Sequence, residues 1–174
     1  MERTVYKRKK SAYKVAVLGM LTALAVVFGY VEYLIPFNIG IPGVKPGLAN
    51  LVILAVLYFF SFPEALCVSL IRVFINSLLF GNLFGMMYGT AGAVLSLSVM
   101  WIIKKSDRFS IIGVSAAGGC AHNIGQMMIA YAVTRTLPVL WYMPILMICG
   151  TLTGVFIGFL DAFIIKRVNH IIIV

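Results

Sequence analysis

The sequence predicts an all-α, polytopic membrane protein built as a bundle of six transmembrane helices. Of its 174 residues, 62% are hydrophobic and only 11% are charged, whereas a soluble domain has about 25% charged residues. The mean hydropathy is +1.06, and the apolar stretches are close to the length of about 20 residues that crosses a bilayer. This composition excludes an ordinary cytosolic enzyme, a disordered tail and a coiled coil.

The chain opens with a basic segment, which we assign to residues 1–13. Fourteen Lys and Arg residues stand against five acids, for a net charge of +9. A basic run before a first apolar span holds an N-terminus in the cytoplasm, against anionic lipid. We prefer this to nucleic-acid binding because no separate basic domain follows. The next apolar run continues to about residue 35, so we expect a retained helix rather than a cleaved signal peptide.

Charged residues, prolines and glycines mark the ends of the predicted helices. Pro63 suits the first turn of a helix, so it favours a tight hairpin between the second and third segments. The alternative is one long kinked helix, which leaves five spans. With six spans, the helices form a transmembrane domain over 14–166, followed by a tail at 167–174. We place them at 14–36, 47–61, 63–80, 84–104, 110–135 and 139–166.

The distribution of basic residues favours the six-span path. It places eleven basic residues on the side of the N-terminus and two, Lys45 and Arg135, on the other. Such an excess marks the cytoplasmic side. The five-span path moves the cluster at 104–108 to the outside and loses this bias. Both termini are therefore expected in the cytoplasm, and the protein in a bacterial cell membrane.

The longest predicted external connection covers 37–47. Its glycines and prolines prevent a regular helix, yet Phe37, Ile39, Ile41 and Val44 recur among polar or small residues. We expect the connection to fold back onto the outer mouth of the bundle. A loop resting on lipid headgroups is the alternative.

Polar side chains within the predicted spans gather in the outer half, which indicates a pocket open to the outside and closed below. Such groups are costly in lipid and face a cavity or one another. Arg72 is always charged, so it requires either an anionic ligand or an internal partner, for which Glu32 or helix carbonyls are the alternatives. His122 is either a pocket residue or a satisfied buried histidine. The candidate substrate-binding residues are Glu32, Lys45, Asn50, Arg72, Asn76, His122, Asn123 and Gln126.

Small residues indicate where helices approach closely, since membrane helices associate by packing. Gly150, Gly154 and Gly158 form one such stripe on the last helix. A second stripe on the first helix is either packed within the bundle or a docking face for a partner membrane protein. It consists of Ala16, Gly19 and Ala23.

Three further groups of residues are not assigned to the substrate site: an acid near the inner end of the last helix, aromatic residues near the outer interface, and the cysteines. Asp161 near Lys166 and Arg167 looks like interfacial anchoring. Aromatic residues near the outer interface form a lipid belt or line the pocket: Tyr30, Tyr33, Phe37, Trp141 and Tyr142. Three cysteines, Cys67, Cys120 and Cys149, lack metal-ligand spacing and are read as packing residues.

The sequence offers no catalytic constellation. It has no Gly-rich phosphate-binding loop ending in Lys-Ser or Lys-Thr, and no Asp-rich pair that could hold magnesium and diphosphate. We therefore predict no catalytic residue, no cofactor and no metal site, and no enzyme activity for this chain by itself.

Three separated motifs carry a family resemblance. They are KPGLAN at 45–50, RVFINSLLFG at 72–81 and AHNIGQ at 121–126, and they resemble the Gx transporter family, also labelled heptaprenyl diphosphate synthase component I, over residues 12–165. That family is similar to the substrate-binding S components of energy-coupling-factor (ECF) transporters. The resemblance implies a six-helix bundle with an outward pocket. It also implies docking, through a small-residue face of the first helix, onto a coupling membrane protein that works with two ATPase subunits.

These observations lead to one expected function and two alternatives. The first is capture of a small, anionic, vitamin- or isoprenoid-like molecule from outside the cell. The second, from the family label, is a membrane accessory subunit of a polyprenyl diphosphate synthase. A self-contained secondary transporter ranks last, because inverted repeats are typical of that class and the sequence shows none.

Overall fold

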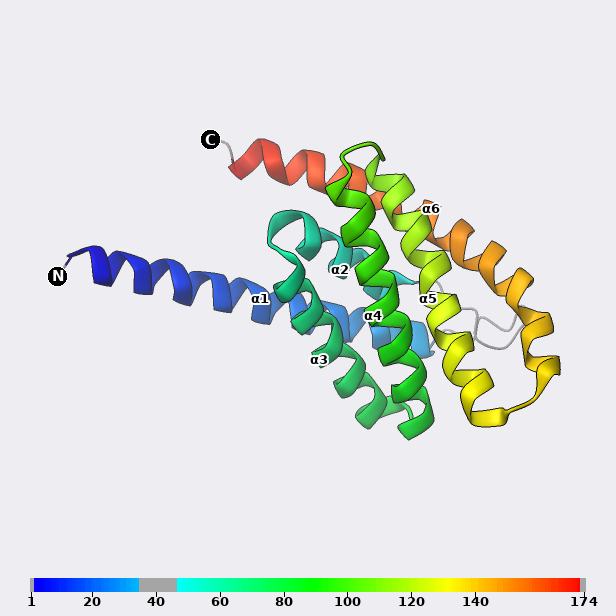
Figure 1. The fold of residues 1–174 in the computed structure, drawn as a ribbon. Coiled ribbons are helices and arrows are strands. Elements are labelled where there is room, and N and C mark those ends of the chain that lie inside the picture. Colours follow the sequence, from blue (N-terminus) through cyan, green and yellow to red (C-terminus); the bar gives the residue numbers. More distant parts are fainter. Residues whose placement is uncertain (1, 35–46, 173–174) are drawn as a thin grey trace.

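The computed structural model describes residues 2–34 and 47–172, and within them it is entirely helical, which confirms the predicted all-α class. The predicted connection at 37–47, including Lys45, lies outside these residues except for Gly47. Six α-helices and one 3-10 helix are present in the described ranges (Figure 1). They are α1 (Glu2–Leu34), α2 (Leu48–Phe59), α3 (Phe62–Phe80), α4 (Leu83–Lys105), α5 (Ile111–Thr134), η1 (Leu137–Tyr142) and α6 (Met143–Ile172).

Local sequence signals explain most helix boundaries. Pro63 occupies the first turn of α3, where its missing N–H costs nothing. The Asn82 side chain caps α4 by accepting a hydrogen bond from Gly85 N at 2.7 Å, and Ser110 caps α5 in the same way.

Three boundaries differ from the prediction. The basic segment at 2–13 is helical and continuous with the first apolar helix. The last predicted helix, 139–166, instead begins as η1, which has Pro138 in its first turn. It continues as α6 from Met143 to Ile172, so the predicted tail at 167–174 is helical through residue 172. The sequence of neither helix contains a residue pattern that defines these boundaries.

Four of the described segments are long and apolar enough to cross a membrane, which is typical of a multi-pass membrane protein: Ala12–Leu34, Phe62–Phe80, Leu83–Lys105 and Leu140–Val168. The remaining two helices fall short for different reasons. With 12 residues, α2 is about 18 Å long, whereas the hydrocarbon core is about 30 Å thick. With 24 residues, α5 is long enough but carries several polar side chains. The six-span path therefore stays a prediction.

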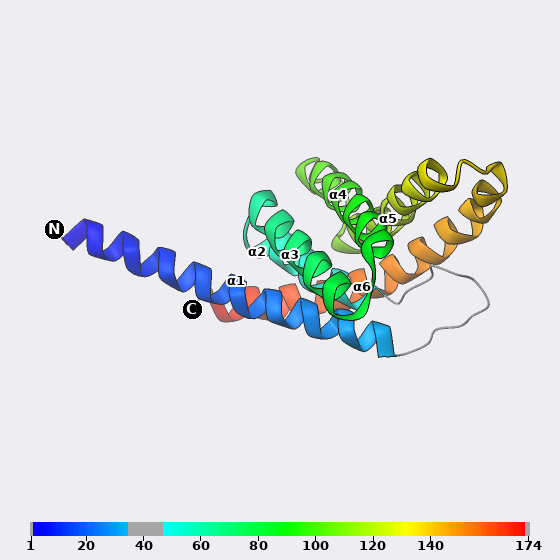
Figure 2. The same cartoon turned by 90° about the horizontal axis from the view of Figure 1, so that it is seen from below.

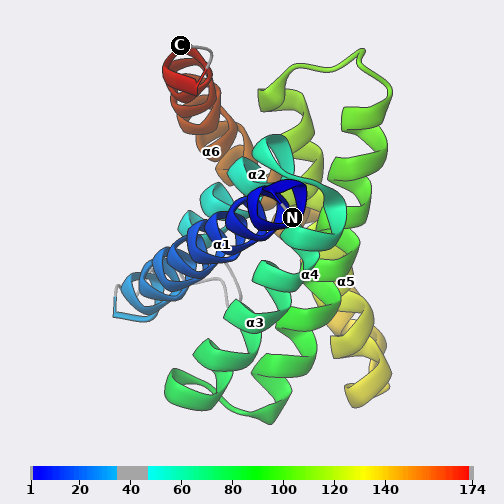
Figure 3. The same ribbon diagram turned by 90° about the vertical axis from the view of Figure 1, so that its left-hand side faces the viewer.

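The helices contact one another in the order α1, α3, α4, α5, α6 and α2, with α2 returning to α1. In Figure 3, α1 crosses in front of α2, while α4 and α5 run side by side. Most of α2 is buried, and its side chains form the centre of the apolar core. The core consists of Ala25, Val52, Ile53, Leu54, Val56, Leu57, Ala65, Val68, Leu97, Met100 and Val114.

Among the helix pairs that meet at glycines, α5 and α6 bring their backbones closest together. A β-carbon added at Gly154 would lie 2.6 Å from Ser115 O and 2.8 Å from Ala116 Cα. One added at Gly158 would lie 2.7 Å from Ile112 Cα. These distances are too short for a real side chain, so the predicted glycine stripe on the last helix packs directly against α5.

The N-terminal half of α1 extends away from the other helices, as Figures 1 and 2 both show. Where α1 reaches the bundle, Lys14 forms a salt bridge with Glu64 at the start of α3. Nearby, Lys104 Nζ donates a hydrogen bond to Leu57 O at 2.7 Å, which ties the end of α4 to the end of α2. These contacts hold the end of the molecule that carries the α2–α3 and α4–α5 connections.

Large apolar side chains are exposed on α1, α3, α4 and α6. A soluble monomer rarely exposes a continuous apolar surface of this kind, whereas lipid-facing helices require one. The exposed residues include Met20, Leu24, Leu78, Leu79, Ile102, Phe156, Phe159 and Phe163.

A polar cavity between the two halves of the bundle

A cavity of about 180 Å³ lies between the helices, and all six α-helices contribute residues to its wall. It occupies the half of the molecule that contains the end of α1, the start of α2, the end of α3 and the start of α4. The apolar core fills the opposite half, so the cavity is closed on that side. The polar side chains that line it are Glu32, Tyr33, Asn50, Arg72, Asn76, Ser77, His122, Asn123, Gln126 and Thr153.

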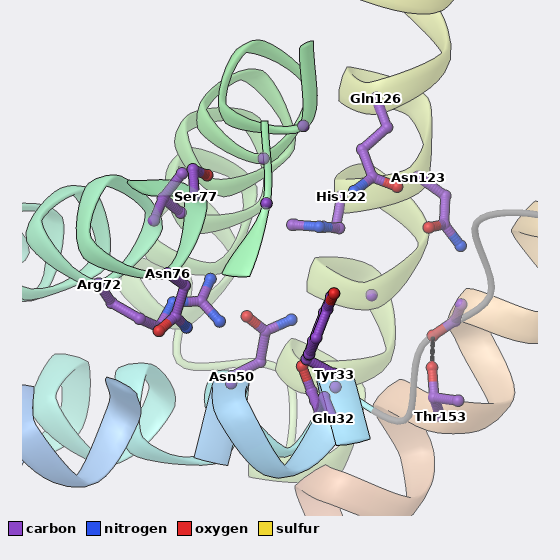
Figure 4. A pocket seen from close by; sticks show the side chains of 18 of the residues that line it. Glu32, Tyr33, Asn50, Arg72, Asn76, Ser77, His122, Asn123, Gln126 and Thr153 are labelled. Atoms are coloured by element: carbon purple, nitrogen blue, oxygen red, sulfur yellow. Dashed lines mark hydrogen bonds between the residues drawn. The ribbon is translucent and has the colours of Figure 1, made fainter. Parts of the chain in front are cut away.

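The polar groups occupy two facing walls (Figure 4). Arg72 and Asn76 lie one turn apart on α3, and His122 and Gln126 lie one turn apart on α5. Asn50 lies between the two walls. The cavity is therefore shared between α1–α3 on one side and α4–α6 on the other.

Arg72 is the most distinctive residue of this site. It is 8% exposed, and within the described part of the chain it forms no salt bridge, and its Nε has no hydrogen-bond partner. The Arg72–Glu32 ion pair considered from the sequence is therefore not formed, although the charge of Glu32 acts on Arg72. Glu32 Oε1 instead accepts a hydrogen bond from Ala49 N at 3.4 Å, in the first turn of α2, where a carboxylate is favoured by the helix dipole.

Asn76 extends the α3 wall towards α1. Its Oδ1 is buried and has no hydrogen-bond partner in the described ranges. Its Nδ2 lies directly over Gly29, so a β-carbon at that position would overlap it. The absence of a side chain at Gly29 is what leaves room for the Asn76 carboxamide.

The residues of the opposite wall are held more firmly. The His122 ring packs on Gly92 of α4, where a β-carbon would lie 2.8 Å from His122 Cε1. Asn123 Nδ2 donates to Leu146 O and joins α5 to α6. Thr153 Oγ1 donates to Cys149 O at 3.0 Å and to Gly150 O at 3.1 Å within α6.

The structure brings seven of the eight candidate substrate-binding residues to this cavity, and the eighth, Lys45, lies outside the described residues. Their binding role stays a prediction. The candidate docking residues Ala16, Gly19 and Ala23 are exposed on α1. Nothing lies within 4 Å of a β-carbon built on Gly19, so this stripe is not packed inside the chain.

Sequence reasoning missed two polar residues of the wall and misread a third polar residue. Ser77 follows Asn76 and was not counted as a site residue. Thr153 gave no signal, because a threonine that bonds to its own helix is inexpensive in lipid. Asp161 is fully buried, which corrects the interpretation of it as an interfacial anchor. Its four-residue spacing from Ile157, which is also buried, is the signal that places it on an inward face.

The aromatic residues were expected either to form a lipid belt or to line the pocket. Tyr33 lines the cavity and lies near Phe80, with ring centroids 5.9 Å apart. Trp141 and Tyr142 do not line the cavity, and all three residues are more than half exposed, at 64% for Tyr33, 83% for Trp141 and 53% for Tyr142. Within the described ranges, no group of three His, Cys, Asp or Glu residues could hold a metal ion.

An all-helical chain with apolar helices long enough to span a bilayer and a polar cavity between them is typical of a multi-pass membrane protein. The chain belongs to the family described as heptaprenyl diphosphate synthase component I, whose model matches residues 21–164. This confirms the family resemblance. The description names a component of a synthase and not a complete enzyme. Searches of curated proteins and of solved structures gave no match.

Proposed function

We propose that this protein is a substrate-capture subunit of a membrane uptake system, of the S-component type, with six helices crossing the membrane. The observation that carries the proposal is the polar cavity with buried Arg72 at its wall. A buried cation that forms no salt bridge in the described part of the chain is costly, so a site that keeps one is expected to use it on an anion.

The placement of the cavity supports capture from outside the cell. The bias of basic residues assigns both termini to the cytoplasm. With six spans, the α3–α4 and α5–α6 connections then face outwards, and the cavity is in that half of the molecule. Lys45 belongs to the external connection and is proposed as a second cation near the mouth.

The exposed stripe on α1 is the proposed docking face for a coupling membrane protein, which would work with two ATPase subunits. Small residues let another helix approach closely, and Ala16, Gly19 and Ala23 are all exposed. In such an assembly, ATP hydrolysis by the partners would drive release of the captured molecule.

A pull-down of the tagged protein from its native membranes in mild detergent, with mass spectrometry of the bound proteins, tests this proposal. We expect a coupling protein and two ATPases, and we expect Gly19→Leu to lose them. Ala132→Leu, which places the same side chain at an exposed position of α5, should retain them. Recovery of bound proteins that include no ATPase would contradict the proposal, and so would an equal loss of the partners in Gly19→Leu and Ala132→Leu.

The family description supports a second candidate, an accessory subunit for a polyprenyl diphosphate synthase. In that case the same pull-down recovers a prenyl synthase. The purified protein should then change the rate or product length of that synthase. No change in either quantity would exclude this role.

A further inference from the structure

The cavity restricts the chemical class of the molecule that it can hold, and this inference rests on the proposed capture function. Its volume is about 180 Å³, and a protein cavity of roughly 150 Å³ takes up a benzene molecule. A ligand that fills it has on the order of ten non-hydrogen atoms. A prenyl diphosphate of several isoprene units is far larger, so its chain cannot be enclosed here.

The charges of the cavity point to a ligand with one negatively charged group. Among the described residues that line it, Arg72 is the only lysine or arginine, and Glu32 brings a negative charge to the same space. With Lys45 at the mouth, as proposed above, Glu32 offsets one of the two cations and a single positive charge remains. Recognition of a diphosphate requires several cationic groups or a metal ion. One guanidinium matches one carboxylate in charge and in planar geometry.

The unsatisfied atoms of α3 define a second requirement. Arg72 and Asn76, one turn apart, both line the cavity, and Arg72 Nε and Asn76 Oδ1 are shielded from water without a hydrogen-bond partner among the described residues. Each such atom costs free energy until it is paired. A ligand against this wall would present a carboxylate to the Arg72 guanidinium and, beside it, an O–H or N–H donor to the Asn76 carboxamide oxygen.

We infer that the cavity binds a compact monocarboxylate that carries a hydroxyl or amino group next to its carboxylate. The α3 wall recognises this part of the molecule. The facing residues, His122 and Gln126, contact the remainder.

Thermal unfolding of the purified full chain in lipid nanodiscs tests this inference, because a ligand that binds the native state raises its unfolding midpoint. The probes are propionate, lactate, alanine and inorganic diphosphate. We expect lactate or alanine to raise the midpoint at concentrations about tenfold lower than propionate, which lacks the donor. Whichever of the two is more effective identifies the donor as hydroxyl or ammonium. Diphosphate should give no shift.

Two variants assign the effect to the α3 wall. Arg72→Gln should abolish the rise in unfolding midpoint caused by each of the carboxylate probes. Gly29→Ala forces the Asn76 side chain to move, so it should remove the preference for lactate or alanine over propionate. Gly113→Ala, where the nearest atom to the β-carbon is Phe109 Cδ1 at 3.6 Å, serves as the control and should keep the preference.

Each contrary result has a defined meaning. A shift with diphosphate, equal responses to propionate and the donor-bearing acids, or no response to any carboxylate would overturn the inferred ligand class. If the preference for lactate or alanine over propionate survives Gly29→Ala, Asn76 does not recognise the ligand. These outcomes do not depend on the pull-down, so a coupling protein recovered with a failed carboxylate screen would refute the ligand class and leave the capture function in place.

Discussion

Replacement of Gly154 by alanine should destabilise the bundle strongly, because the added carbon meets backbone atoms that cannot rotate away. It would lie 2.6 Å from Ser115 O and 2.8 Å from Ala116 Cα. Atoms of this kind are separated by about 3.5 Å at an ordinary contact, so α5 and α6 must move apart by roughly 1 Å. Overpacking of this extent costs about 3 kcal/mol, which corresponds to a fall of about 6–12 °C in the unfolding midpoint.

The assay is thermal unfolding of the purified protein in detergent, followed by far-ultraviolet circular dichroism. Gly113→Ala is the matched control on α5, since its new carbon would make only ordinary contacts. We expect the control to stay within about 0.5 kcal/mol of the original protein. Equal midpoints for Gly154→Ala and Gly113→Ala would refute the close α5–α6 contact.

Three further predictions use the same or simpler measurements. Asp161→Asn should raise the unfolding midpoint, because both carboxyl oxygens are buried without a hydrogen-bond partner in the described ranges and a neutral amide of similar shape is less costly there; a lower midpoint would reveal a stabilising partner. Asn82→Ala should cost about 1 kcal/mol by removing the cap of α4, and Asn82→Ser should restore most of it; equal midpoints would contradict the cap. In a chain without its native cysteines, a membrane-impermeant maleimide added to intact cells should label Cys introduced for Arg135 and not for Arg108; the reverse labelling would invert the topology.

The helices were largely predictable because local residues determine where most of them begin and end. Pro63 marked the start of α3 in the sequence, whereas the caps Asn82 and Ser110 of α4 and α5 were identified only in the structure. The α1 extension through 2–13 was not predictable, since basic residues are compatible with either helix or an irregular segment. The 3-10 start near Pro138 depends on how the connection from α5 reaches α6, which is a tertiary feature.

The cavity was predictable in part, for an energetic reason. Arg72, Asn76 and His122 are costly in lipid, so each had to face inwards, and helices that turn their polar residues inwards bring them together. Thr153 carries no such cost because its hydroxyl is satisfied within its own helix. Asp161 was misread because its sequence neighbours Lys166 and Arg167 suggested the interface, whereas helical spacing assigns it to a buried face.

The glycine contact between α5 and α6 also determines which part of the molecule can adapt its shape. Two backbones that already touch at Gly154 and Gly158 cannot come closer, so the α5–α6 side behaves as a fixed surface. The helices on the other side, α1 to α3, meet it through less extensive contacts. A change in cavity size must therefore come from movement of α1–α3, and this is the unit that carries both Arg72 and the exposed stripe of α1. Occupancy of the cavity and the position of the stripe would then be two readouts of a single displacement.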